Sequence, residues 1–332
     1  MITEAEQIYT PAARRALVSF GVEPADLRFI RLAENVTFRV TDARDGLPLV
    51  LRLHRPWYHD IVALQSEHIW TRALVQAGIA APEPLLTQAG ESFTQAEITE
   101  TGERRWVGLA RWVEGELLAD VIARETDTDA NASRMAQVGA IMAAMHNQAR
   151  GWTPPAGFQR HMLDADGLMG PKPFWGPFWD QAILSHGERD MLLRMRDRLH
   201  AALTCYGQPA RTFSLIHADL HPSNVVIDGA RAAVIDFDDS GFGWHLYDVA
   251  AALTAYQDHP DFAVLRDGFI AGYRSVRAIS DEDLALLPMF LLIRDMATLG
   301  WYHQRPELPQ TAALPQLKER VCEIAADFEL PI

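Results

Sequence analysis

The sequence predicts an α+β protein of two lobes, in which a small β-rich lobe precedes a larger, mostly helical one. Five strand-like runs in the first third alternate apolar and polar residues or are rich in β-branched ones, at 27–32, 36–40, 49–53, 92–99 and 106–112. Helical spacing of apolar residues dominates after residue 113. Because 332 residues are enough for two separate cores, we predict an N-terminal lobe over 1–113 and a C-terminal lobe over 114–332.

The predicted N-terminal lobe contains an antiparallel sheet of five strands, with one helix inserted after the third strand. A leading helix is expected over 4–19, and Asp45-Gly46 predicts a tight hairpin between the second and third strands. The inserted helix covers 60–77. Pro82 and Pro84 then favour an extended connection to the last two strands.

The predicted C-terminal lobe is built mainly from helices. Eight helical segments are expected, near 116–124, 131–149, 173–185, 188–205, 245–257, 261–277, 281–303 and 311–328. Three short strand-like runs interrupt them, at 213–216, 225–227 and 232–235. Residues 151–177 are rich in Gly and Pro and predict a long loop, a feature that often carries function.

The overall composition disfavours several classes of protein. A formal net charge of −14 argues against a nucleic-acid partner; it suits a cationic substrate, although an acidic soluble surface is the commoner cause. Cys205 and Cys322 form no CxxC pair, which predicts a reducing compartment. We expect a cytoplasmic protein, since the first residues lack signal-peptide features and no apolar run approaches the roughly 18 residues that span a membrane. The oligomeric state is left open.

One motif carries most of the chemical information. The pattern HxDxxxxN occupies 217–224, and Ile235-Asp236-Phe237-Asp238 follows after a short apolar run. Phosphoryl transfer requires one carboxylate near the attacking hydroxyl, and an amide oxygen and a second carboxylate on magnesium. Asp219, Asn224 and Asp236 are these residue types, in the order and at the spacing of a kinase catalytic loop. We therefore predict Asp219 as the catalytic carboxylate and Asn224 and Asp236 as metal ligands.

Other interpretations of the motif remain open at this point. Asp219 alone could be a turn residue shortly before a proline. His217 and His221 suggest a zinc site, but HExxH requires a Glu directly after the first His, where Ala218 stands. We expect His217 to hold the loop and His221 to act near the transferred phosphate. No GxxxxGK[ST] is present, which disfavours a P-loop NTPase.

Together with Leu246-Tyr247-Asp248-Val249-Ala250, the motif resembles the aminoglycoside phosphotransferase and choline kinase superfamily, over about residues 27–305 and most strongly over 213–250. The style of the motifs is nearest to two subgroups, the bacterial stress response kinase and type II homoserine kinases. The former shares the segment 54–59 and the pair Asp238-Asp239. The resemblance implies a bilobal protein-kinase-like fold, ATP and Mg²⁺ as cofactors, and γ-phosphate transfer to a hydroxyl of a small metabolite or amino alcohol.

Two alternatives accompany this expectation. A Ser/Thr protein kinase of the stress response type needs an open groove for a protein acceptor, and the loop at 151–177 decides between groove and closed pocket. An inactive nucleotide-binding scaffold is disfavoured, because such proteins usually lack the catalytic carboxylate or a metal ligand, and here all three residues are present.

The resemblance also implies a nucleotide site. Its residues would come from the loop between the first two strands, the third strand, the inserted helix and the hinge at 109–113: Asn35, Arg52, Glu67, Ala110 and Val113. Arg52 stands where many relatives have Lys, and the order of the two residues favours a pair with Glu67. The alternatives are an edge-strand surface cation for Arg52 and a solvated helix face for Glu67. Asp248 is expected to hold the catalytic loop by hydrogen bonds.

Aromatic residues suggest a pocket for a quaternary amine. Trp175 and Trp179 are four residues apart and would share a helix face. With Trp152 and Trp244 they could surround a cationic group, although packing of the helical lobe is the simpler explanation.

Three polar residues are further candidates for substrate contacts. Arg294, on the predicted helix 281–303, would bind an anionic group of the acceptor or be a surface cation. Asp238 and Asp239 would contact a second metal or the substrate, or be solvated loop residues.

Overall fold

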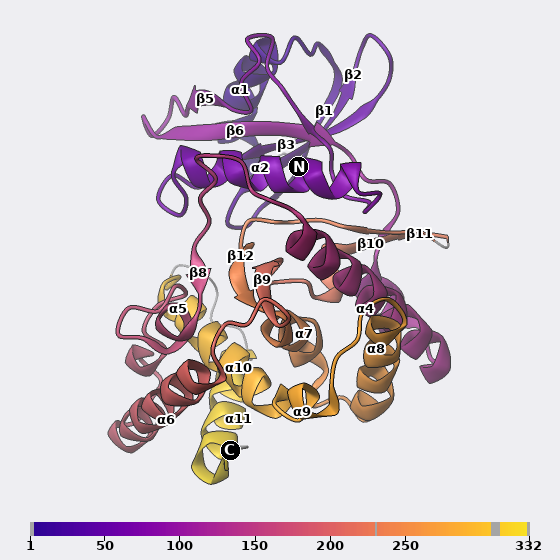
Figure 1. Ribbon diagram of the computed structural model, residues 1–332. Coiled ribbons are helices and arrows are strands. Elements are labelled where there is room, and N and C mark those ends of the chain that lie inside the picture. Colours follow the sequence, from indigo (N-terminus) through magenta and orange to yellow (C-terminus); the bar gives the residue numbers. More distant parts are fainter. Residues whose placement is uncertain (1–2, 230, 307–312, 331–332) are drawn as a thin grey trace. The chain divides into compact units, whose positions relative to one another are not determined.

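The computed structural model describes residues 3–229, 231–306 and 313–330 (Figure 1). The chain divides into two compact units. Unit 1 comprises Met1–Glu116, Pro154–Arg160 and Val226–Asp238, and unit 2 comprises Leu117–Thr153, His161–Val225 and Asp239–Ile332. Two later segments of the chain therefore belong to the first unit. The predicted α+β class, with an antiparallel sheet in the first third and a mainly helical remainder, is confirmed.

Unit 1 is built on a sheet of six strands in the order β1-β2-β3-β6-β4, with β5 also paired to β6. The strands are β1 Pro24–Leu32, β2 Val36–Asp42, β3 Pro48–Leu53, β4 Pro84–Leu85, β5 Thr94–Glu97 and β6 Arg104–Arg111. The expected number of five was too low. The proline-rich connection is extended, as predicted, and its last two residues pair with β6, where Pro84 lies opposite Ala110.

Two helices accompany this sheet, α1 Glu4–Ser19 and α2 Ile61–Gln76. Both begin where a side chain caps the helix: Thr3 accepts a hydrogen bond from the Glu6 amide, and Asp60 from the Ala63 amide. Apolar residues of α1, among them Ala13 and Leu17, share one core with alternate residues of β2, β3 and β6. The alternation in β2 buries every second side chain, as its sequence predicts.

Unit 2 is largely helical. Its helices are α3 Leu118–Arg124, α4 Thr128–Gly151, α5 Ala165–Met169, α6 His186–Tyr206, α7 His245–Leu253, α8 Phe262–Val276, α9 Asp281–Leu284, α10 Leu287–His303 and α11 Ala313–Asp327. Helices α4 and α8 lie side by side (Figure 1). They approach closely at Gly139 and Gly272, where an added Cβ would stand 2.1 Å from the Phe269 carbonyl oxygen and 1.9 Å from that of Ala136.

Short strands complete the chain. In unit 2, β12 Gly241–Trp244 pairs parallel with β8 Met162–Leu163 and antiparallel with β9 Phe213–Ile216. β10 Val225–Asp228 neighbours β11 Arg231–Val234, and β7 covers Glu116–Leu117. The predicted loop 151–177 thus contains both β8 and α5. Helix α7 also ends at Leu253, earlier than predicted, and continues as a 3-10 turn, η3 Thr254–Tyr256.

The predicted helix at 173–185 is wrong. Only a 3-10 turn, η1 Phe178–Asp180, forms there. Pro177 lacks an amide donor and Gly176 has a φ of +93°, which ends any helical path. Trp175 and Trp179 therefore do not share the face of one helix.

One helical stretch, Asp281–His303, is long and apolar enough to cross a membrane by length and composition alone. About 61% of an apolar 18-residue window within it is buried inside the structure, as in a core helix. It also carries Asp295, which is 1% exposed and accepts hydrogen bonds from Arg320 and Thr254. The predicted helix 281–303 is thus two helices, α9 and α10, and we interpret α10 as a core helix whose Asp295 forms an ion pair with Arg320 of α11.

Candidate active site

The HxDxxxxN loop starts where β9 ends, and one buried carboxylate holds its first turn. Asp248, in α7, accepts hydrogen bonds from the amides of His217 at 3.1 Å and Ala218 at 2.8 Å. Ala218 has a φ of +68°, a left-handed conformation that is unfavourable for a residue with a Cβ. The hydrogen bonds to Asp248 stabilise this turn. The expected role of Asp248, to hold the loop by hydrogen bonds, is therefore confirmed.

A buried chain of polar groups continues behind Asp248. His146, in α4, bonds to the Asp248 carboxylate at 3.0 Å through Nε2 and to the Tyr273 hydroxyl at 2.9 Å through Nδ1. Burial raises the pKa of Asp248 to about 6, although the charge and amide of His217 favour the ionised form. Burial also lowers the pKa of His146 far below its ordinary value, so this imidazole is neutral.

The predicted catalytic and metal-binding residues of the loop lie together. The amide nitrogen of Asn224 donates to the Asp219 carbonyl oxygen at 2.9 Å and to the Asp219 carboxylate at 3.2 Å. His221 Nε2 lies 3.4 Å from the same carboxylate. Asn224 ends a 3-10 turn, η2 Pro222–Asn224, and its side-chain nitrogen faces the loop. The amide oxygen accepts no hydrogen bond from the described residues and is available to a ligand.

Arg294, in α10, makes the closest contact to the Asp219 carboxylate. Its guanidinium donates to Asp219 Oδ1, to the Ala218 carbonyl oxygen at 3.2 Å and to the Tyr247 hydroxyl at 3.3 Å. Burial raises the pKa of Asp219, but the charges of His221 and Arg294 outweigh this and hold that pKa well below its ordinary range. Asp219 therefore remains a carboxylate. Arg294 is a partly buried ion-pair partner rather than a surface cation.

Of the other substrate candidates in unit 2, Trp175 and Asp239 interact with Arg294, whereas Trp179 interacts with Arg196. Trp175 is 2% exposed, stacks on Tyr247, and its ring centroid lies 5.3 Å from the Arg294 guanidinium carbon. The charge of Asp239 also acts on Arg294 and Tyr247. Trp179 instead packs under Arg196.

The proposed cage of four tryptophans does not form. Trp244 is 1% exposed, donates its indole N–H to the Gly207 carbonyl oxygen at 2.8 Å and packs against Phe213. Arg294 already lies over the Trp175 ring. Packing within unit 2 therefore explains Trp175, Trp179 and Trp244.

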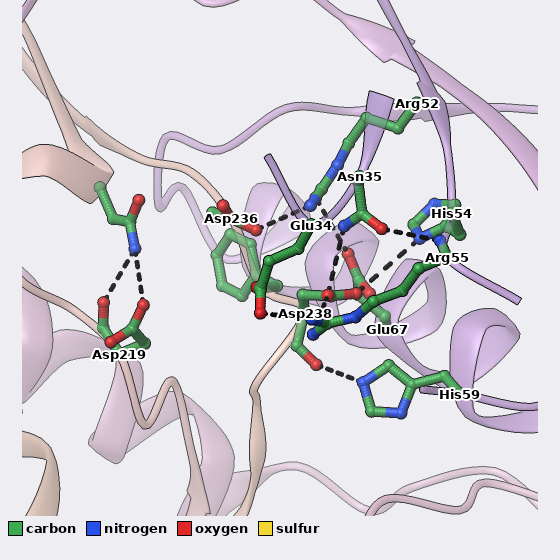
Figure 2. A network of polar contacts seen from close by, with 12 residues as sticks. Glu34, Asn35, Arg52, His54, Arg55, His59, Glu67, Asp219, Asp236 and Asp238 are labelled. Carbon is green, nitrogen blue, oxygen red and sulfur yellow. Dashed lines mark hydrogen bonds and ion pairs between the residues drawn. The ribbon is translucent and has the colours of Figure 1, made fainter. Parts of the chain in front are cut away.

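In unit 1, Asp236 lies near two arginines, one of which, Arg52, is seen beside it in Figure 2. Its carboxylate accepts a hydrogen bond from Arg52 Nη2 at 2.8 Å and lies 3.7 Å from Arg31 Nη2. Arg52 also lies 3.9 Å from Glu67, so the expected ion pair is present, although Asp236 is the closer partner. Asp236 has a φ of +66°, one of two left-handed non-glycine residues in the described chain. The other is Ala218, so one lies in each of the two acidic motifs.

Asp238 lies at the centre of a buried network that ties the 33–36 loop to the segment after Asp236 (Figure 2). It is 6% exposed, and its carboxylate accepts hydrogen bonds from Asn35 Nδ2 at 3.2 Å and Arg55 Nη2 at 3.4 Å. The Asn35 amide oxygen in turn accepts from the Arg55 backbone amide at 3.0 Å. The interpretation of Asp238 as a solvated loop residue is wrong, because its carboxylate compensates buried cations.

Glu67 and Asp238 carry opposite pKa shifts. Burial raises the pKa of Glu67, and the charge of Asp238 adds to this effect. Burial acts on Asp238 in the same direction, but the His54 imidazole, whose Nδ1 lies 3.8 Å from the carboxylate, and the charge of Arg52 outweigh it and hold the pKa of Asp238 well below its ordinary value. Asp238 thus carries the negative charge of this cluster.

Replacing Asp238 with Ala is expected to lower the free energy of unfolding by about 3–5 kcal/mol, because Asn35 and Arg55 lose a buried acceptor. Urea denaturation measures this loss. Asp26→Ala, at an exposed position of β1, is the matched control. If Asp238 instead contacted the substrate, the variant would keep wild-type stability and show only a raised KM.

His59 makes the stability of the protein depend on pH. Its Nε2 donates to the Asp238 carbonyl oxygen at 2.7 Å. Burial lowers the pKa of His59 from 6.5 to about 4, and the charge of Arg160 acts in the same direction. The unfolded chain therefore binds a proton that the folded protein excludes. Stability is fully present above pH 6.5 and falls as the pH drops towards about 4.

His59→Gln is expected to reduce this acid-induced loss by on the order of 2 kcal/mol, since Gln keeps a donor for the carbonyl and does not titrate. Urea denaturation at a series of pH values between neutrality and the lowered pKa measures the slope. His186→Gln, at an exposed position in α6, should follow the wild type. Equal slopes for His59→Gln and the wild type would contradict the assignment.

Residues from distant segments were not predicted from the sequence. They are Arg31, His146, Arg160 and Tyr247, which contact Asp236, Asp248, Asp238 and Arg294 respectively. Of these, Tyr247 lies within the quoted segment 246–250, whereas no local pattern marks Arg31, His146 or Arg160 as a partner. Ala110 pairs with Val50 in the sheet, and Val113 follows the end of β6. The contact of these two residues with adenine stays a prediction.

The fold and the motif geometry define a class. An α+β chain whose HxDxxxxN loop is anchored by a helix aspartate, and whose next acidic motif places Asp236 beside a strand arginine, is a protein-kinase-like phosphotransferase. The sequence model of the phosphotransferase enzyme family matches residues 26–284. The chain therefore belongs to this family, and it is a phosphotransferase with an alcohol group as acceptor.

Similar proteins agree with this assignment. Amicoumacin kinase of Bacillus subtilis is 24% identical over 314 residues, which cover 91% of this chain and 86% of that kinase. A microcompartment-associated aminopropanol kinase has a TM-score of 0.79 and 29% identity, over 96% of this chain and 94% of its own. The amicoumacin kinase hAmiN, solved with AMP-PNP, Ca²⁺ and Ami, has a TM-score of 0.77 at 20% identity, over 98% and 94%. The predicted family, fold class and enzyme class are confirmed.

Proposed function

We propose that this phosphotransferase moves the γ-phosphate of ATP, in a magnesium-dependent reaction, to the hydroxyl of a small amino alcohol. The observation that carries the proposal is the Asp219 carboxylate, which is kept ionised and bonded to Asn224 within a loop anchored by Asp248. The amicoumacin kinase solved with AMP-PNP and Ca²⁺ supports a nucleotide and a divalent cation as cofactors.

The residues present fit a magnesium ion. Asn224 and Asp236 offer oxygen ligands, which suit a hard cation rather than zinc. The Asn224 amide oxygen accepts no hydrogen bond from the described residues, and the Asp236 side chain is 27% exposed and so accessible. When bound, magnesium neutralises the oxygens of the transferred phosphoryl group.

The protein's own residues would orient the acceptor. Asp219 accepts a hydrogen bond from the attacking hydroxyl, and its low pKa makes it an orienting group more than a strong base. Arg294 and Asp248 hold this carboxylate and its turn in place. His221 would add positive charge near the transferred phosphate.

We assign nucleotide binding to the first lobe, 1–113, and acceptor binding to the second, 114–332. Arg52 would bind the phosphates once it leaves Asp236, and Glu67 would then be its partner. The Asn35 side chain donates to the Asp238 carboxylate and accepts from the Arg55 backbone amide. It would thereby hold the 33–36 loop in place for the nucleotide. Ala110 and Val113 would offer backbone groups to adenine.

We propose a cationic acceptor. The negative charges of Asp219 and Asp239 act on Arg294, which lies over Trp175, in a chain whose formal net charge is −14. The similarity to an aminopropanol kinase supports an amino alcohol. The cysteine usage, two residues far apart with no CxxC pair, supports a reducing compartment such as the cytoplasm.

An acceptor screen tests the proposal. The purified chain, with ATP labelled in the γ-phosphate and Mg²⁺, is offered small amino alcohols, their deoxy analogues and Ser/Thr-containing peptides. Label is expected on the amino alcohols and absent from the deoxy analogues. Labelled peptides alone would favour the protein-kinase alternative, and ATP binding without transfer to any acceptor would favour the scaffold.

A further inference from the structure

Unit 2 contains a cavity of about 560 Å³ that includes no residue of the HxDxxxxN loop. It lies at the ends of α4 and α8, which run side by side, and at the start of α7 (Figure 1). Its volume falls in the range of small-molecule sites. Its walls combine charged side chains with an apolar part made by Leu246, Tyr273, Val276 and Ile279.

The charge of this cavity is opposite to that of the whole protein. Three arginines line it, Arg150, Arg211 and Arg277, against a single carboxylate, Asp283. Asp283 pairs with Arg211 at 2.5 Å. The cavity is positive although the chain has a formal net charge of −14, and a positive concavity attracts anions.

Within the described part of the chain, two of the three guanidinium groups have no carboxylate as ion-pair partner. Arg277 donates to the Asn147 amide oxygen at 2.7 Å and to the Arg211 carbonyl oxygen at 2.7 Å, both neutral acceptors. These bonds position the Arg277 side chain without neutralising it. Arg150 has no ion-pair partner among the described residues. Two oriented cations of this kind suit a phosphate or carboxylate group, which guanidinium binds with two parallel hydrogen bonds.

The wall of the cavity touches the network that holds the catalytic loop. His245, which lines it, stacks on His146 with ring centroids 4.1 Å apart. Tyr273, a second wall residue, bonds to His146 through its hydroxyl. His146 bonds to Asp248, and Asp248 holds the amides that begin the loop. Ligand binding that moves either wall residue therefore alters the support of the loop.

We propose that this cavity is a second binding site, for a small organic anion that joins a phosphate or carboxylate group to an apolar body. Its occupation is coupled to the 217–224 loop through His245, Tyr273 and His146. The inference goes beyond the proposed function, because neither the site nor its test requires phosphate transfer.

Phenyl phosphate is the probe, and calorimetric titration of the whole chain measures its binding. Saturating AMP-PNP with Mg²⁺ is present throughout, so that a nucleotide site does not compete for the probe. Arg150→Gln/Arg277→Gln is expected to weaken binding at least tenfold. Arg134→Gln/Arg266→Gln removes the same charge from the same two helices outside the cavity and should stay within twofold of the wild type. Inorganic phosphate should bind more weakly than phenyl phosphate.

Arg150→Gln alone is the second variant, because this exposed residue has no partner whose loss would disturb folding. It should weaken binding several-fold and keep the wild-type melting temperature. Hydrogen exchange tests the coupling: saturating phenyl phosphate should change the exchange of the amides of His217 and Ala218 in the wild type and leave the double variant unchanged.

Two results would overturn the proposal. Equal affinity of the wild type and both cavity variants would place the probe elsewhere. Exchange at His217 and Ala218 that does not respond to a bound probe would remove the coupling to the loop.

Discussion

Replacing Asp219 with Asn is expected to lower the rate of phosphate transfer by about 10³-fold and to leave the affinity for nucleotide unchanged. Asn has the shape of Asp but not its charge, so it orients the acceptor hydroxyl poorly and stabilises no developing positive charge on it. The bonds from Arg294 and Asn224 show that the surroundings are arranged for a carboxylate.

Two measurements check this expectation. Steady-state turnover gives kcat, and calorimetric titration with AMP-PNP and magnesium gives the nucleotide affinity. Asp120→Asn, at an exposed position in α3, is the control for a general loss of charge. Turnover of Asp219→Asn within a few-fold of the wild type would refute the role assigned to Asp219.

Replacing Arg294 with Met should lower kcat by about 10²-fold, with the KM for ATP nearly unchanged. Met has a similar length and packs against Trp175 and Tyr247, but it cannot donate to Asp219 or to the Ala218 carbonyl oxygen. The carboxylate then loses its orientation and its closest compensating charge. Breaking the Arg294–Asp219 pair should also lower the free energy of unfolding by about 3 kcal/mol.

Separate measurements of kcat and of the KM for the acceptor distinguish two roles for Arg294. As a positioning residue it affects kcat, and Arg294→Lys should recover part of the activity because it restores one charged donor. If Arg294 bound an anionic group of the acceptor, as the sequence alone suggested, the KM for the acceptor would rise while kcat stayed near the wild-type value. Arg198→Met, on the exposed side of α6, is the control.

Local patterns predicted most of the secondary structure. The helices expected at 4–19 and 60–77 are α1 and α2, since apolar periodicity and a capping side chain act within a few residues. The strands β4, β8 and β12 were missed because they are two to four residues long and exist only through their partners. The false helix at 173–185 arose from apolar spacing that ignored the turn at Gly176 and Pro177.

The sequence by itself determined the chemical content of the motif, because Asp219, Asn224 and Asp236 are recognisable from residue type and spacing alone. Tertiary structure decided what surrounds these residues. Arg294 lies 75 positions from Asp219, and His146 lies 102 positions from Asp248. No local pattern encodes such pairs, because only folding removes the side chains from water and makes the nearest opposite charge decide their ionisation.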